Sequence, residues 1–143
     1  MKAINEIKIT LQSRSVNEGF ARVAVASFLS QLDPTIDEMN DIKTAVSEAV
    51  TNCIVHAYKD TIGKIYINVS IYEDKTVSIR IRDNGCGIDD VEKAREPLFT
   101  TAGGERAGLG FAVMESFMDR VRVSSKKDKY TSVTLRKRIG TKQ

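Results

Sequence analysis

The chain has 143 residues, 41% of them hydrophobic and 29% charged, which is typical of one globular domain, and we expect residues 1–143 to form a single one. It has no apolar run of about 18 residues and no signal-peptide core near its start, which excludes a transmembrane helix and indicates the cytoplasm. A net charge of +3 is too small to argue for a nucleic-acid partner.

A strand and a helix are predicted at the start of the chain. Apolar and polar residues alternate over Ile7–Leu11, the pattern of a strand with one buried face. Ser15, with Glu18 three residues later, has the form of a capping box, so we expect a helix from there to about Leu32. Helical spacing places its apolar side on Phe20, Val23, Ala24 and Phe28.

A second helix is expected to run from Thr35 to Tyr58. Thr35 and Glu38 form a second possible capping box, and the proline before them suits a helix start. Apolar residues then recur at steps of three and four positions and predict a wide buried stripe: Met39, Ile42, Ala45, Val46, Ala49, Val50, Cys53, Ile54 and Ala57. Cys53 and Cys86 do not have the pattern of a disulfide framework or a metal site, so both are expected to be small buried hydrophobes.

A polar stripe lies beside this buried one. Glu48, Asn52 and His56 follow each other at four-residue steps, so their side chains stack along one edge of the helix. One interpretation is a carboxylate and an amide that face a cleft, and the other is a polar margin that faces water. His56 is the chain's one histidine and is expected to be structural rather than catalytic.

A β-hairpin is predicted next from the alternating runs 65–72 and 77–82, which makes the sheet at least partly antiparallel. The sequence Asp83-x-Gly85-x-Gly87 follows directly. Its carboxylate could accept a hydrogen bond from the exocyclic amine of a purine, and glycines without a Cβ let another molecule approach closely. The alternative is an ordinary Asp-Asn-Gly turn, because short glycine motifs often arise by chance.

The rest of the chain predicts a short helix, a glycine-rich loop, another helix and two strands. The short helix is expected at 89–95 and the loop at 98–110, where four glycines and few apolar anchors indicate mobility. The loop leads into a helical pattern at 111–118, and the free N–H groups of such a helix start favour phosphate. A flexible linker is the alternative. Strands are expected at 120–125 and 131–137.

Three motifs stand in a recognisable order: a helix that carries Glu48 and Asn52, the Asp83 motif, and a glycine-rich loop that ends in Gly108–Gly110. Together they resemble the GHKL ATP-binding superfamily, which includes gyrase, histidine kinases and mismatch-repair ATPases. The resemblance implies an α/β fold of two layers, with helices on one face of a mixed, mostly antiparallel sheet. It also implies ATP held between a helix and a lid.

Longer sequence segments point to one family within this superfamily. Ser47–Asn52, Pro97–Thr101 and Phe20–Val23 are similar to the anti-sigma F factor family (stage II sporulation protein AB) of endospore-forming bacteria, and the likeness covers nearly the whole chain. It implies a protein that inhibits a sporulation sigma factor, sigma F, and is also an ATP-dependent serine kinase acting on an anti-anti-sigma protein. It further implies a homodimer that binds ATP or ADP with Mg²⁺ and contacts neither nucleic acid nor membrane.

Matching the motifs residue by residue implies individual roles. Asn52 would hold the Mg²⁺ that bridges the phosphates, and Glu48 would be the base toward the substrate serine. Asp83 would bind the adenine amine, and Arg22 matches an arginine that contacts the protein partners. Thr131 is implied as a weaker adenine contact, because many superfamily members have a glycine before it. The other implied nucleotide contacts are Gly85, Gly87, Thr100, Thr101, Arg106, Gly108, Leu109 and Gly110.

The implied chemistry agrees with the residues themselves. Phosphoryl transfer depends mainly on positioning and on stabilisation of charge. An amide oxygen is a suitable hard ligand for Mg²⁺. Glu48, one helical turn before Asn52, could reach a hydroxyl near the γ-phosphate.

Several other functions are alternatives. A histidine kinase would need a phospho-accepting histidine on a separate helical hairpin, which His56 does not provide, and a gyrase-like ATPase would need a further domain. A switch kinase of the general stress response would carry the same motifs. A non-catalytic module that holds ATP or sigma factor is a further alternative, although Glu48 argues against it. The last is an interaction domain without a ligand.

Overall fold

The computed structural model describes residues 2–58, 61–87 and 104–140, with the backbone alone for 104–109. In chain order the elements are β1 (Ala3–Gln12), α1 (Asn17–Leu29), the 3₁₀ turn η1 (Ser30–Leu32), α2 (Ile36–Asn52), the π-helical turn η2 (Cys53–Ala57), β2 (Lys64–Tyr72), β3 (Thr76–Asp83), α4 (Gly104–Phe117), β4 (Arg120–Lys126) and β5 (Tyr130–Arg138). The short helix predicted at 89–95 lies outside the described residues. Within the described ranges, no helix is both long and apolar enough to span a bilayer.

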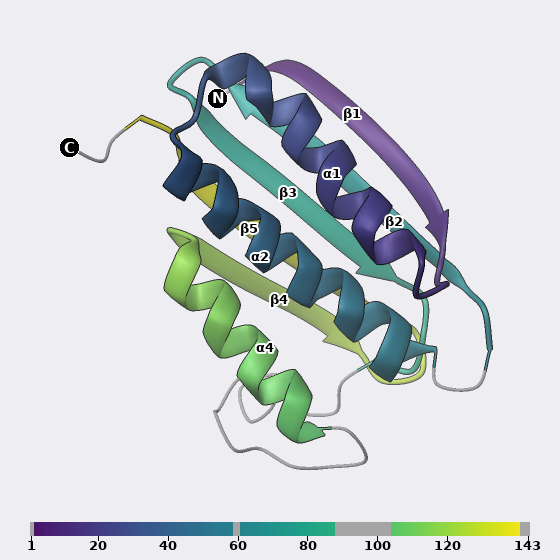
Figure 1. Cartoon of the computed structure of the whole chain (residues 1–143). Helices are drawn as coiled ribbons and strands as arrows, with labels where there is room; N and C mark the ends of the chain where they lie inside the picture. Colours follow the sequence, from purple (N-terminus) through teal and green to yellow (C-terminus); the bar gives the residue numbers. More distant parts are fainter. Residues whose placement is uncertain (1, 59–60, 88–103, 141–143) are drawn as a thin grey trace.

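Five strands form one sheet in the order β1-β2-β3-β5-β4, and each neighbouring pair is antiparallel. Figure 1 shows α1, α2 and α4 on one face of this sheet, with α2 between the other two. The predicted two-layer sandwich with helices on one face is therefore confirmed. The sheet was expected to be mixed and mostly antiparallel, and the described strands pair in antiparallel fashion throughout.

Apolar and polar residues alternate along β2 and β3, and this pattern decides which face of the sheet meets the helices. Their buried apolar residues are Ile65, Ile67, Val69, Ile71, Val77, Ile79 and Ile81. The predicted stripe of α2 is buried against them at Ile42, Ala45, Val46, Ala49 and Val50, and Cys53 continues it on η2. Removing this apolar surface from water is the main stabilising term of the fold. It also fixes the rotation of α2, and thereby the edge on which Glu48 and Asn52 lie.

Helix α1 buries a different side from the one predicted. Ala21, Val25 and Leu29 are buried at four-residue steps, whereas Phe20 and Val23 are 57% and 59% exposed. Most residues of this helix are apolar or small, so two stripes overlap and periodicity alone does not choose between them. The stripe that begins with the small Ala21 joins the core that α2 also contributes to, which leaves Phe20 and Val23 in solvent, whereas Phe28 is partly buried against the core.

The start of α1 also differs from the prediction. Val16 precedes the helix without a side-chain cap, and the capping box of Ser15 and Glu18 is not formed. The Glu18 carboxylate instead accepts a hydrogen bond from Ser47 Oγ and lies 3.5 Å from Arg22 Nε. Because Glu18 turns toward α2, it joins the two helices rather than the N-terminus of its own.

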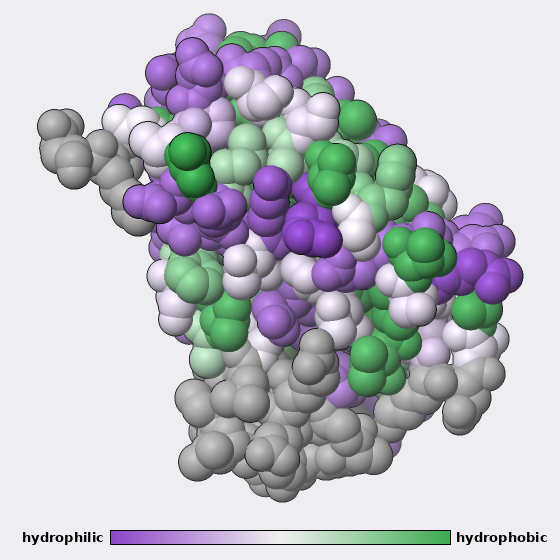
Figure 2. All heavy atoms as spheres, viewed as in Figure 1, coloured by the Kyte–Doolittle hydropathy of each residue, from purple (hydrophilic) through white to green (hydrophobic). Residues whose placement is uncertain are grey.

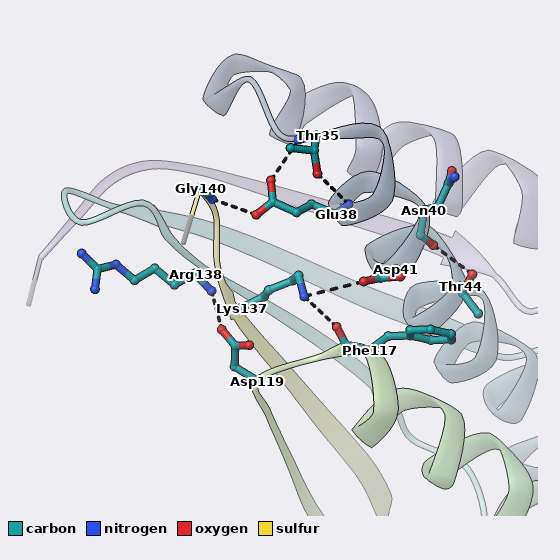
Figure 3. Close-up of polar contacts among 10 residues, drawn as sticks. All are labelled: Thr35, Glu38, Asn40, Asp41, Thr44, Phe117, Asp119, Lys137, Arg138 and Gly140. Atoms are coloured by element: carbon teal, nitrogen blue, oxygen red, sulfur yellow. Dashed lines mark hydrogen bonds and ion pairs between the residues drawn. The ribbon is translucent and has the colours of Figure 1, made fainter. Parts of the chain in front are cut away.

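The capping box at the start of α2 is confirmed and is part of a larger polar cluster (Figure 3). Thr35 Oγ1 accepts the Glu38 N–H at 3.1 Å, and the Glu38 carboxylate accepts the N–H groups of Thr35 at 2.9 Å and Gly140 at 2.8 Å. Glu38 is 1% exposed. Burial alone would raise the pKa of Glu38, but these hydrogen bonds hold it below its ordinary 4.5. The carboxylate thus ties the end of β5 to α2.

Glu38→Gln is expected to lower the free energy of unfolding by about 1.5–3 kcal/mol at neutral pH, as for hydrogen bonds to a charged group. The native pKa is depressed, so the stabilisation exists above the ordinary value of 4.5 and is lost as the pH falls through the lower native value. Denaturant unfolding from neutral to acidic pH should therefore show the two proteins converging. Glu73→Gln, on the exposed hairpin turn, is the matched control; an equal loss there, or a difference that persists in acid, would contradict this role.

A buried lysine anchors the C-terminal end of α4. Lys137 Nζ donates to the Phe117 carbonyl at 2.9 Å and lies 3.9 Å from Asp41 Oδ2, as Figure 3 shows. A cation at a helix C-terminus is favourable because the last carbonyls have no partners within the helix. This contact holds one end of α4 against β5 and the first turns of α2.

Candidate functional site

Two polar side chains of α2 face α4. Glu48 and Asn52 lie one helical turn apart, and both are half-buried. A Cβ built on Gly110 would lie 3.1 Å from Glu48 Oε2 and 3.3 Å from Asn52 Nδ2, so the backbone of α4 passes directly over both side chains. The structure therefore brings these three predicted site residues together between α2 and α4.

The Asn52 amide lacks the hydrogen-bond partners that a buried amide normally has. Its oxygen Oδ1 and nitrogen Nδ2 are both buried without a hydrogen-bond partner among the described residues. Leaving a buried polar group without a partner costs about 1–3 kcal/mol, so native structures rarely do it. Two such atoms on one side chain indicate a place for a ligand.

The donor set fits Mg²⁺ held jointly with phosphates. In the described part of the chain, no group of three or more His, Cys, Asp or Glu side chains could hold a metal by itself. Mg²⁺ is commonly bound through one or two protein oxygens, with phosphate oxygens and waters completing its shell. Asn52 Oδ1 is a ligand of that kind.

The α-helix gives way to the π-helical turn η2 directly after Asn52. Its closing bond runs from the Tyr58 N–H to the carbonyl five residues earlier, at 3.3 Å. The predicted α-helix to Tyr58 is therefore wrong in its last turn, because apolar spacing does not distinguish the two bond patterns. His56 lies within this π-helical turn, so the regular α-helical spacing that aligned it with Glu48 and Asn52 ends before it. Cys86 Sγ donates to the His56 carbonyl at 3.3 Å. Cys86 is exposed rather than buried as predicted.

Asp83 ends β3 next to this turn. It is 3% exposed, and its Oδ1 accepts the Gly85 N–H at 2.9 Å. The Cys53 thiol and the backbone of Thr131, its partner in the β3–β5 register, lie close to the carboxylate and favour its charged form. Burial raises the pKa of Asp83 above its ordinary 3.8, although these groups and the Gly85 N–H oppose the rise. Because Cys53 directly follows Asn52, the contact places Asp83 beside the end of α2.

The two glycines of the Asp83 motif are required by the packing of their own loop. A Cβ on Gly85 would lie 2.4 Å from the Ala57 carbonyl oxygen, and one on Gly87 would lie 2.2 Å from that of Lys126. Gly87 also has a φ of +72°, which side chains disfavour. The close approach predicted here is thus made by the chain itself, and contact of these glycines with a nucleotide stays a prediction.

The sequence pattern does not mark Tyr58, yet this residue positions the Asp83 loop. Its hydroxyl donates to the Lys64 carbonyl at 2.7 Å and accepts the Asn84 N–H at 2.7 Å. Its ring fills the space that a side chain on Gly63 would need. A tyrosine at the end of a buried apolar stripe is a usable signal, because a buried hydroxyl requires a partner.

Arg22 lies on the rim of an open depression between α1 and α2. Its side chain is 44% exposed and its Nε lies 3.5 Å from Glu18 Oε2. Asn40 and Lys43 line the same depression, which extends along α2 to Glu48. An accessible polar surface therefore connects the predicted partner contact with the predicted base.

The lid predicted at 98–110 is described from Gly104 onward. Helix α4 begins there, seven residues earlier than the predicted helix at 111–118, because Glu, Arg, Ala and Leu are good helix formers and outweigh the two glycines inside the helix, Gly108 and Gly110, at about 1 kcal/mol each. Thr100 and Thr101 lie outside the described residues. Three further lid residues fall where the backbone alone is described: Arg106, Gly108 and Leu109. Their contacts with a nucleotide stay predictions.

Comparison with known proteins covers nearly the whole chain. Residues 10–137 match the family model described as the histidine kinase-like ATPase domain. The anti-sigma F factor of Caldanaerobacter subterraneus subsp. tengcongensis is 54% identical over 141 residues, with 98% of each chain covered. Those of Clostridium perfringens strain 13 and Bacillus subtilis strain 168 are each 52% identical, covering 96% and 95% of this chain and 99% and 94% of their own.

Solved structures support the fold. A crystal structure of the RsbU and RsbW domains of Rv1364c from Mycobacterium tuberculosis superposes with a TM-score of 0.70 at 21% identity, covering 94% of this chain and 32% of that one. The histidine kinase domain of a blue-light activated histidine kinase from Erythrobacter litoralis gives a TM-score of 0.57 at 18% identity, covering 85% and 61%. At these identities the likeness concerns the fold alone.

Proposed function

This chain belongs to the histidine kinase-like ATPase domain family and, within it, to the anti-sigma F factors, and from that membership we propose its function. It binds Mg·ATP between α2 and α4 and transfers the γ-phosphoryl group to a serine of an anti-anti-sigma protein. It also holds a sporulation sigma factor of the sigma F type inactive, and it acts in the cytoplasm, where sigma factors work. The names of its relatives support the sigma-factor partner.

The Asn52 amide is the single observation that carries nucleotide binding. Both of its polar atoms are buried without a partner among the described residues, and Glu48 and Gly110 lie against them. An Mg²⁺ ion on Asn52 Oδ1, when bound, would neutralise phosphate charge during transfer. The buried Asp83 carboxylate, beside the end of α2, suits the exocyclic amine of adenine.

Glu48 is proposed as the general base. Its carboxylate lies one turn before Asn52, on the side of α2 that the open depression reaches. In the transfer, the serine hydroxyl gives its proton to Glu48 while its oxygen bonds to the γ-phosphorus. The bond from that phosphorus to the β–γ bridging oxygen breaks, and ADP leaves with the electron pair.

The depression from Arg22 to Glu48 is proposed as the partner surface. Arg22 is exposed at its rim and Lys43 lies within it, alongside the Glu18 carboxylate, so the depression offers charges of both signs along a path to the base. Two proteins that need this one surface would compete for it. Binding of the anti-anti-sigma protein there would therefore release the sigma factor.

A homodimer is proposed through the uncovered apolar side of α1. Phe20 and Val23 are more than half exposed, and Val16 before the helix is 76% exposed. Figure 2 shows separate hydrophobic patches on the face that carries α1 and α2. Covering such side chains in a second copy would bring a favourable hydrophobic contribution.

Incubation of the purified chain with radiolabelled ATP, Mg²⁺ and the anti-anti-sigma protein tests the proposal. The label is expected on one serine of the partner, and capture of the sigma factor is expected to require nucleotide. Nucleotide binding without transfer would indicate a non-catalytic module. Absence of nucleotide-induced thermal stabilisation would overturn the proposal altogether.

Gly110→Ala is expected to slow transfer several-fold while the protein stays folded. Alanine favours a helix by about 1 kcal/mol over glycine, but the new Cβ would lie 3.1 Å from Glu48 Oε2 and displace that carboxylate. Thermal unfolding and single-turnover phosphorylation measure the two effects. Gly19→Ala, whose Cβ would come no closer than 3.8 Å to Arg22, is the matched helical control. Equal transfer rates in both variants would show that Glu48 tolerates the contact.

A further inference from the structure

The face of the sheet opposite the helices is strongly basic. The register aligns its outward residues in rows across the strands, for example Lys8, Asn68, Arg80, Thr134 and Arg122. The cations at these outward positions are Lys8, Lys64, Arg80, Arg82, Arg120, Arg122, Lys126, Arg136 and Arg138. Glu6 is the one carboxylate among the paired outward positions of the described strands. We call this surface the open face; the small net charge of the chain conceals it.

Like charges meet on the open face. Arg120 and Arg136 stand directly opposite each other on β4 and β5, an arrangement that destabilises a sheet. Within the described ranges, no ion pair joins a carboxylate to either of them or to Arg80, Arg82 or Arg122. Repulsion of this kind is relieved when a polyanion binds, so the open face is suited to an anionic partner.

Tyrosines and small polar residues lie among these arginines. Tyr66, Tyr72 and Tyr130 are three of the four tyrosines of the chain, and all project from the open face. The Arg82 guanidinium lies 4.6 Å from the centre of the Tyr130 ring, and that of Arg136 lies 5.7 Å from the Tyr72 ring. Such contacts hold a guanidinium in a defined plane.

Two open depressions mark the same face. One lies over β2 and β3, where Tyr66, Arg80 and Arg82 line it together with asparagines. The other lies over β4 and β5, with Arg120 and Arg122 beside serine and threonine hydroxyls. Arginine with hydroxyl, amide and tyrosine donors is the combination that contacts phosphate and sugar in nucleic-acid complexes.

We propose that the open face binds single-stranded nucleic acid, with arginines on the phosphates and bases stacked on tyrosine rings or guanidinium planes. Aromatic residues on an exposed sheet are a known platform for this. A protein partner fits less well, because the core of a protein interface is depleted of charge and this face has charge at its centre. A membrane would need apolar anchors, and duplex readout would need an element that enters a groove.

Fluorescence anisotropy with labelled oligouridylate and oligothymidylate of about 12 nucleotides tests the proposal on the whole chain. Binding in the micromolar range is expected. With about four phosphates neutralised, affinity should fall roughly 50-fold between about 50 and 200 mM salt. No binding at the lower salt, or binding that salt does not change, would overturn the proposal. A polyglutamate peptide or phosphatidylserine vesicles bound as tightly as the oligonucleotides would overturn it as well.

Two double variants distinguish binding by the open face from an effect of the overall charge of the protein. Arg80→Gln with Arg122→Gln should weaken oligonucleotide binding at least tenfold and flatten its salt dependence. Lys75→Gln with Lys129→Gln removes the same charge at exposed hairpin turns and should bind as the wild type does. Tyr66→Ser keeps every charge and should cost about tenfold through lost stacking. Circular dichroism and ATP binding establish that each variant is folded. Equal affinities of both pairs, or an unchanged affinity in Tyr66→Ser, would contradict the assignment.

Discussion

Glu48→Gln is expected to reduce phosphoryl transfer to the anti-anti-sigma protein by about 10²–10⁴-fold, the range that a general base contributes, while ATP affinity stays nearly unchanged. Glutamine has the shape of glutamate, so it keeps the contact with Gly110 and leaves Asn52 in place. It cannot accept the proton of the serine hydroxyl. Single-turnover phosphorylation and calorimetric titration with Mg·ATP separate the two effects.

The control for this variant is Glu73→Gln, which makes the same chemical change on the exposed hairpin turn. It should transfer phosphate at the wild-type rate. If Glu48→Gln instead lost its affinity for ATP, Glu48 would belong to the binding machinery and the assignment as base would be wrong. Sigma-factor capture with ATP present should survive the substitution.

Asp83→Asn is expected to weaken ATP binding by about 1–3 kcal/mol, roughly five- to 150-fold, because the adenine amine loses a charged acceptor. The asparagine oxygen can still accept the Gly85 N–H, so the loop keeps its geometry. Calorimetry with Mg·ATP measures the loss. Asp33→Asn, at an exposed left-handed position that asparagine tolerates, is the control.

The pH dependence of the same variant gives an independent check. Burial raises the native pKa of Asp83 above its ordinary 3.8, so protonation stabilises the fold, and this stabilisation is lost as the pH rises through the native pKa. Without nucleotide, Asp83→Asn should therefore equal or exceed the wild type in stability at neutral pH, and this advantage should shrink in acid. A variant that is less stable at neutral pH and also binds ATP poorly would indicate a structural role alone.

Much of the fold follows from local patterns. Alternation over 65–72 and 77–82 predicted the hairpin, and the stripe from Ile42 to Cys53 predicted the buried side of α2. These predictions hold because one face of each element is apolar and the other polar, so a single orientation buries the chain well. The prediction that Glu48 and Asn52 lie together required only that residues four positions apart share one side of an α-helix.

Other features depend on contacts that no local pattern contains. The apolar side of α1 was mispredicted, because Phe20 and Val23 compete with the stripe that packs in the core. The Ser15 box fails because Glu18 bonds across to α2 instead. In the site, Tyr58 and Cys53 position the Asp83 loop through contacts that form only once η2 meets β3.

The basic open face could not be predicted from the sequence, for a similar reason. The cations of β3 are far in the chain from those of β4 and β5, and the overall balance of +3 averages them with acidic residues elsewhere. Only the order in which the strands pair brings them onto one surface.

The measurement that tests the central claim most directly is a crystal structure with Mg²⁺ and a non-hydrolysable ATP analogue. Asn52 Oδ1 should lie about 2.1 Å from the metal, Asp83 should accept a hydrogen bond from the adenine amine, and the γ-phosphate should lie beside Glu48 with its outer side toward the Arg22 depression. A nucleotide bound elsewhere, with the Asn52 amide still without a partner, would contradict the account.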